Sequence, residues 1–79
     1  MDKNTHFPQF RKLSNGKAFY RITSERAFEE IQIAGSKRIL HTITANQYPE
    51  MIRIKDMLEC GFAYEMSDEK EFNSHFIQL

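Results

Sequence analysis

The chain has 79 residues with eleven basic and eleven acidic side chains, so its formal net charge is zero, and it has one cysteine. Balanced charge argues against a surface that attracts nucleic acid or membrane as a whole. One cysteine excludes a disulfide framework. Since there is also no apolar run of roughly 18 residues and no signal-peptide pattern, we expect a soluble cytoplasmic protein without membrane contact.

The length allows a single hydrophobic core. Residues 1–6 are polar and without period, so we expect a flexible N-terminus followed by one small domain over residues 7–79. Charge is divided unevenly, because residues 1–40 have a net charge of +4 and residues 41–79 a net charge of −4. This division predicts a domain with two electrically different sides.

The strongest local signal is Asn15-Gly16, a pair that suits the type I′ turn of a β-hairpin. It predicts strands over residues 8–13 and 17–22. Next, the apolar spacing of residues 24–34 predicts a helix capped by Thr23 or Ser24. Residues 37–45 are rich in β-branched side chains and similar on both faces, which predicts a central strand covered on both sides.

Pro49 suits the first turn of a second helix, which we expect to end at Gly61. Residues 62–66 alternate like a half-buried strand. A third helix is expected from its cap Ser67 to Leu79, with acidic residues in its first turn.

The predicted fold class is therefore α+β, with mixed α/β order ββαβαβα. An N-terminal hairpin and right-handed crossovers would give a four-stranded mixed sheet in which the last three strands are parallel, with three helices. We expect the core to contain the residues Phe28, Ile31, Ile39, Ile43, Ile54, Leu58, Phe62 and Tyr64.

The sequence offers little for catalysis. Cys60 falls in the last turn of a predicted helix, where no positive helix terminus would activate it. The acidic residues after Ser67 are those that a helix N-terminus favours, and no paired metal ligands or glycine-rich phosphate loop are present. We therefore predict no enzyme activity, no catalytic residues, no cofactor, no metal and no small-molecule ligand.

Basic and aromatic residues are interleaved on the predicted hairpin and at the start of the following strand. Cations that neutralise phosphates beside rings that stack on bases are typical of single-stranded nucleic-acid surfaces. A solvated basic sheet edge explains the same pattern. The alternative function is thus a nucleic-acid-binding module that uses Arg11, Lys12, Lys17, Phe19, Arg21, Lys37 and Arg38.

The preferred interpretation is a small non-enzymatic protein-interaction or regulatory domain, because binding requires only a surface. A protein partner or a second copy is favoured over nucleic acid. We expect a two-fold homodimer, formed through the apolar face of the last helix or through an open sheet edge. The helix residues expected at the contact are Phe72, Phe76 and Leu79.

Overall fold

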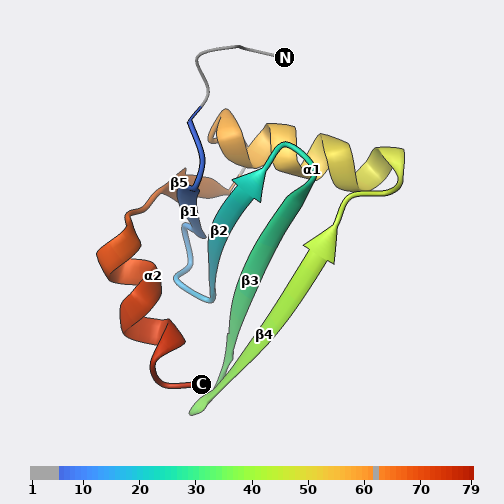
Figure 1. Cartoon of the computed structure of the whole chain (residues 1–79). Coiled ribbons are helices and arrows are strands. Elements are labelled where there is room, and N and C mark those ends of the chain that lie inside the picture. Colours follow the sequence, from blue (N-terminus) through green and yellow to red (C-terminus); the bar gives the residue numbers. More distant parts are fainter. Residues whose placement is uncertain (1–5, 62) are drawn as a thin grey trace.

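The computed structural model describes residues 6–61 and 63–79, which form an α+β domain (Figure 1). Its strands pair in the order β4-β3-β2-β1-β5, and every pairing is antiparallel. The elements in chain order are β1 (Gln9–Leu13), β2 (Ala18–Ser24), β3 (Ala27–Ala34), β4 (Lys37–Thr44), α1 (Tyr48–Leu58), β5 (Tyr64–Met66) and α2 (Glu69–Phe76).

The predicted hairpin is present as β1 and β2, with Phe10 opposite Arg21. Gly16 has a φ of 75°, a value that glycine adopts without steric cost, and its N–H donates to Leu13 O at 2.9 Å. The side chain of Asn15 accepts a hydrogen bond from the N–H of Lys17 at 2.9 Å. The turn lies where the sequence predicts it, but it is not of the predicted type I′, because Gly16 has a positive φ and Asn15 does not.

The helix predicted over residues 24–34 is wrong, because this segment contains a turn and strand β3. Phe28 and Ile31 are three residues apart, as on a helical face, but in a strand they point to opposite faces of the sheet. Each meets a different hydrophobic cluster. Because both faces are covered, the apolar spacing of this strand imitates a helix.

The loss of this helix also changes the topology. Without a crossover between β2 and β4, the first four strands form a continuous antiparallel meander, so the predicted parallel pairing and four-stranded mixed sheet are wrong. Within the described ranges there are five strands and two helices. Strand β5 pairs antiparallel with β1 and forms the second edge of the sheet.

Both remaining predicted helices are present in shorter form. Pro49 lies in the first turn of α1, and Gln47 and Glu50 form its capping box. In α2 the N-cap is Asp68 rather than the predicted Ser67, and its side chain accepts from the N–H of Glu71 at 2.8 Å. A carboxylate at this position also interacts favourably with the helix dipole.

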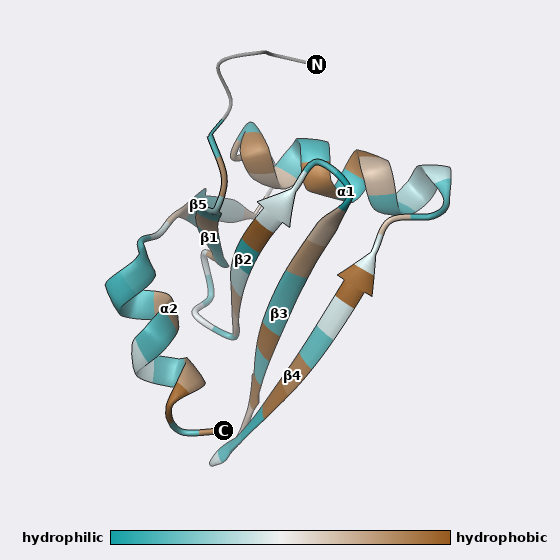
Figure 2. Ribbon diagram, in the orientation of Figure 1, coloured by the Kyte–Doolittle hydropathy of each residue, from teal (hydrophilic) through white to brown (hydrophobic). Residues whose placement is uncertain are grey.

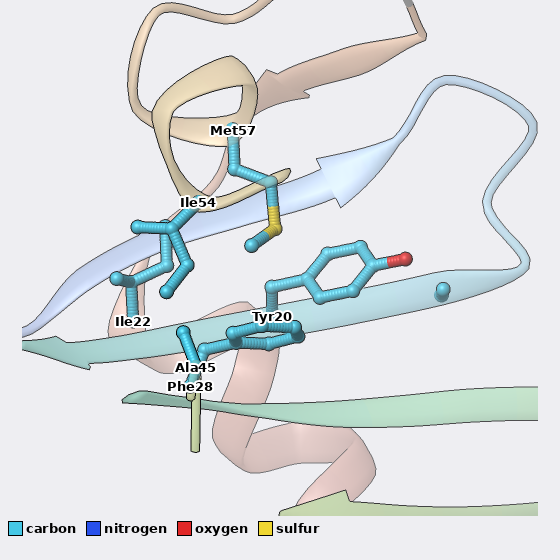
Figure 3. Close-up of a cluster of buried hydrophobic side chains, with 7 residues drawn as sticks. Tyr20, Ile22, Phe28, Ala45, Ile54 and Met57 are labelled. Carbon is cyan, nitrogen blue, oxygen red and sulfur yellow. The ribbon is translucent and has the colours of Figure 1, made fainter. Parts of the chain in front are cut away.

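Helix α1 covers one face of the sheet, which we call the α1 face (Figure 1). Its residues Ile54 and Met57 pack on a cluster contributed by β2, β3 and Ala45, which directly follows β4 (Figure 3). The rings of Tyr20 and Phe28 lie at the centre of this cluster, with centroids 6.1 Å apart. This is the larger of the two cores. Its buried residues are Ala18, Tyr20, Ile22, Phe28, Ala45, Ile54 and Met57.

Helix α2 covers the opposite face, the α2 face, where Phe72 packs against Phe19 and Ile31. Of the eight expected core residues, Phe28, Ile31 and Ile54 are buried as predicted. Three are half-buried, namely Ile43, Leu58 and Tyr64, and Phe62 lies outside the described residues. Ile39 is 43 % exposed, which contradicts the prediction, because its strand lies at the edge of the sheet.

Candidate functional site: the open edge of strand β4

Strand β4 is the outermost strand on one side of the sheet, and no strand of the described residues pairs with its outer side (Figure 1). It is eight residues long, and six of these are exposed. The prediction of a central strand covered on both faces is therefore wrong. A strand of this length at an edge presents a row of unpaired backbone groups to solvent.

The register identifies which backbone groups of β4 point outward. Beyond the end of the strand, Ala45 donates its N–H to Arg26 O at 2.6 Å. Antiparallel residue pairs alternate between bonded and non-bonded positions. Ala45 is in a bonded pair, so every second residue before it in β4 is also in a bonded pair with β3. The odd-numbered residues of β4 therefore direct their N–H and C=O groups towards β3. The outward donors and acceptors belong to the even-numbered residues Arg38, Leu40, Thr42 and Thr44.

A second bond supports this assignment from the other side of β3. Ile33 donates its N–H to Lys17 O at 2.9 Å, so the odd-numbered residues of β3 bond towards β2. The backbone groups of the even-numbered residues of β3 therefore point towards β4, where they meet the odd-numbered residues of β4, in agreement with the first assignment. The outward row of β4 is thus determined by two independent hydrogen bonds.

Apolar side chains flank this row on both faces of the sheet. Ile39 lies on the α1 face with 43 % of its surface exposed, and Leu40 lies on the α2 face with 37 % exposed. Figure 2 shows the corresponding hydrophobic bands along β4. From Ile39 to Thr44 the strand has no proline, glycine, lysine or acidic residue, which are the usual means of blocking strand addition.

The opposite edge of the sheet is different. Strand β5 has only three residues, and Glu65 is at its centre. Short edge strands with charged residues are poor templates for another strand. The sheet therefore has one long edge suited to strand addition and one short edge that is not.

A polar cluster joins α1 to strands β2 and β3 of the sheet. Arg53 donates from Nη2 to the buried Glu30 carboxylate at 2.7 Å and to the Tyr20 hydroxyl at 3.2 Å. Burial and the neighbouring Glu30 carboxylate raise the pKa of Tyr20 well above its usual value, so the phenol stays protonated. Every buried side-chain nitrogen and oxygen of the described residues has a hydrogen-bond partner. The cluster is satisfied internally and is best explained as a structural connection.

A shallow groove lies between β5 and the N-terminal half of α2. Lys12 contacts the Glu71 carboxylate at 3.2 Å, and Ser67 also donates to that carboxylate. The Ser67 hydroxyl and Lys12 lower the pKa of Glu71. The Glu71 carboxylate in this groove is therefore already paired with polar groups of the domain itself.

The proposed nucleic-acid residues are not gathered on one surface. Arg11 is 5 % exposed and donates from Nε to Met57 O at 2.8 Å and from Nη2 to Leu58 O at 3.1 Å. It binds the C-terminal carbonyls of α1, as basic residues often do. Phe19 is buried, and His75 stacks on its ring at a centroid distance of 4.1 Å. Neither side chain is placed to contact a nucleic acid.

Three other members of this set have partners within the domain. Lys12 pairs with Glu71 and Arg21 with Glu29, while Arg38 donates from Nε to His75 Nδ1 at 3.1 Å. The two remaining cations, Lys17 and Lys37, are exposed and lie in or next to turns. Binding of nucleic acid stays a prediction, but the structure assigns most of its proposed residues to internal contacts.

The proposed partner-contact residues of α2 are also divided. Phe72 is fully buried against the sheet, so this side chain is not available to a second chain. Phe76 and Leu79 are 36 % and 50 % exposed. The guanidinium of Arg21 lies 5.5 Å from the centroid of the Phe76 ring and covers one face of that ring. The helix therefore folds back on its own sheet.

Within residues 6–61 and 63–79, no group of three His, Cys, Asp or Glu side chains could hold a metal ion. No helix of this part of the chain is long and apolar enough to span a bilayer. Cys60 is half-buried and lies just beyond the C-cap of α1, with a positive φ of 54°, so the prediction that it falls in the last turn of the helix is wrong.

The open edge was missed at the level of strand order, although its residues were predicted to form a strand. The run from Ile39 to Thr44, which contains no Lys, Arg, Asp or Glu, was its available signal, and a buried central strand has the same signal. Comparison of the chain with family models, with curated proteins and with solved structures found no match.

Proposed function

We propose that this domain is a protein-binding module that recruits an extended segment as an additional strand beside β4. The observation that carries the proposal is the outward row of backbone groups at Arg38, Leu40, Thr42 and Thr44, flanked by exposed apolar side chains. Strand addition of this kind obtains its affinity from main-chain hydrogen bonds and its specificity from the alternating side chains.

The energetics favour a segment that is apolar at alternate positions. Four residues present one donor and one acceptor each, so eight bonds at about 0.5 to 1.5 kcal/mol would contribute about 4 to 12 kcal/mol. Association itself costs an estimated 4 to 15 kcal/mol. Backbone bonds alone therefore about cancel this cost. Contacts with Ile39 and Leu40 are needed for measurable affinity.

The test uses a phage library of random ten-residue peptides, selected on the whole chain at low protein concentration. Thr42→Pro removes an outward N–H that has no partner in β3, so the domain should fold and lose the selected peptides. Thr42→Ala retains that N–H and should bind them within a few-fold of the original affinity. Circular dichroism checks the fold of both variants.

The two variants separate backbone recognition from side-chain recognition at one position. Peptides that tolerate Thr42→Pro, or the absence of any binder after repeated selection, would contradict strand addition at this edge. If Thr42→Pro and Thr42→Ala reduce the affinity for the selected peptides equally, the peptides recognise the threonine side chain instead of the backbone.

A further inference from the structure

We infer that the segment that fills the β4 edge is β4 of a second copy, paired antiparallel about a two-fold axis at His41. This inference rests on the proposed function, because it requires the same outward backbone row. The axis is perpendicular to the sheet, so the α1 face of one copy continues into the α1 face of the other.

The outward row is symmetric about His41. Arg38 and Thr44 lie three residues to either side of it, and Leu40 and Thr42 lie one residue to either side. In a pair centred on His41, each outward residue therefore meets an outward residue of the second copy. Moving the axis by one residue, to Leu40, would shift the pairing of the two strands by two residues. Thr44 would then lie opposite Ser36, which belongs to a turn. Centring on His41 satisfies the whole row.

Side chains along β4 also suit this register. On the α1 face, Ile39 lies opposite Ile43 of the second copy on both sides of the axis. Apolar β-branched pairs of this kind stabilise antiparallel sheets. On the α2 face, Leu40 lies opposite Thr42. Pairing would cover part of the exposed Ile39 side chain, which accounts for an apolar residue at an open edge.

Charge does not oppose the pair. The net charge of the chain is zero, so two copies do not repel each other at long range. Lys37 and Arg38 are at the start of β4, so antiparallel pairing places the cations of the two copies at opposite ends. At the axis, His41 bonds to Gln32 at 3.2 Å and lies opposite Glu30, whose carboxylate pairs with Arg53.

The assembly closes at two copies. Pairing through β4 consumes the long edge of each sheet and leaves a β5 strand of three residues at either end. These short edges are poor templates for further strands. A second copy therefore covers the open edge, and the dimer offers no long edge to which further copies could add as a fibre.

Cysteine cross-linking tests the register directly. In a Cys60→Ser background, His41→Cys places two thiols at the axis in a non-bonded antiparallel pair, where Cα atoms are about 4.5 Å apart. This separation is within the range of a disulfide. Leu40→Cys is the matched control, because two copies of residue 40 would be about 8 Å apart, given a rise of about 3.4 Å per residue and a strand spacing of about 4.8 Å. Mild oxidation should link most of the first variant and little of the second.

Sedimentation of the unmodified chain accompanies the cross-linking. A dimer mass at high protein concentration, together with selective linking of His41→Cys, is the expected result. Linking of Leu40→Cys instead would overturn the register, and a monomer mass at about millimolar concentration would overturn the dimer. If the chain is monomeric but selected peptides still depend on the N–H of Thr42, the proposed function stands and only the second copy is rejected.

Discussion

Arg53 of α1 donates a hydrogen bond of 2.7 Å to Glu30 of β3, and this pair joins the helix to the sheet. The Glu30 side chain is 7 % exposed, whereas that of Arg53 is 38 % exposed. The Arg53 guanidinium also lies over the Phe28 ring at 5.2 Å. The carboxylate is therefore buried only because the arginine compensates its charge.

Arg53→Met should lower the free energy of unfolding by about 1 to 3 kcal/mol, because it leaves the Glu30 carboxylate buried without a cationic partner. The double variant Arg53→Met with Glu30→Leu should be less destabilised than this single variant, since no charge is then stranded. Urea denaturation of the unmodified chain, the two single variants Arg53→Met and Glu30→Leu and the double variant measures the difference. Additive losses would contradict the compensating role of the pair.

Stability should depend on pH through His75. Burial of its ring against the sheet and the nearby Arg38 guanidinium lower the pKa of His75 below its ordinary value. The unfolded chain therefore takes up this proton more readily than the folded chain does. The stabilising contribution is complete above about pH 6.5 and is lost as the pH falls below it.

This dependence is measured by urea denaturation at about pH 7.5 and about pH 5.5, on either side of the ordinary histidine pKa. His75→Gln cannot titrate, so its free energy of unfolding should fall less between the two values. An equal fall in both proteins would show that His75 does not contribute.

Arg11 should be important for stability rather than for binding. Its guanidinium satisfies carbonyl oxygens of Met57 and Leu58 at the end of α1, and its side chain is buried. Arg11→Met should reduce the free energy of unfolding by about 1 to 3 kcal/mol, because these buried carbonyls lose their donors. Arg11→Lys should restore only part of the loss, since an ammonium lacks the planar fork of donors. Full recovery by lysine in thermal melting would contradict this role.

The two cores should respond separately to truncation. Phe28→Ala and Phe72→Ala each remove a fully buried ring, from the α1 face and the α2 face, and should cost about 3 to 5 kcal/mol. Phe76→Ala is the matched control on α2, because its ring is partly exposed and should contribute less. Thermal melts that are unchanged for Phe28→Ala or Phe72→Ala would show that the assigned faces are wrong.

Local features of the fold could be predicted from sequence. The Asn15-Gly16 turn and the proline at the start of α1 depend on the conformational preferences of one or two residues. They are present where expected. Interactions of this range are visible in the chain itself.

Strand β3 could not be predicted in the same way, because Phe28 and Ile31 are apolar for two different reasons. Phe28 faces α1, Ile31 faces α2, and both helices come later in the chain. The buried Glu30 further conceals the alternation of the strand, since its burial depends on the distant Arg53. The predicted strand order depended on whether this segment is a helix or a strand. Because it was predicted as a helix, the edge position of β4 could not be predicted.

Amide hydrogen exchange along β4 is the most direct test of the open edge and its self-pairing. At low protein concentration, Leu40 and Thr42 should exchange rapidly, whereas His41 and Ile43 should be protected by their bonds to β3. Raising the protein concentration should then protect Leu40 and Thr42 in parallel with dimer formation, with little change at His41 and Ile43. Slow exchange at Leu40 and Thr42 in the dilute monomer, or rapid exchange at every concentration, would contradict the account.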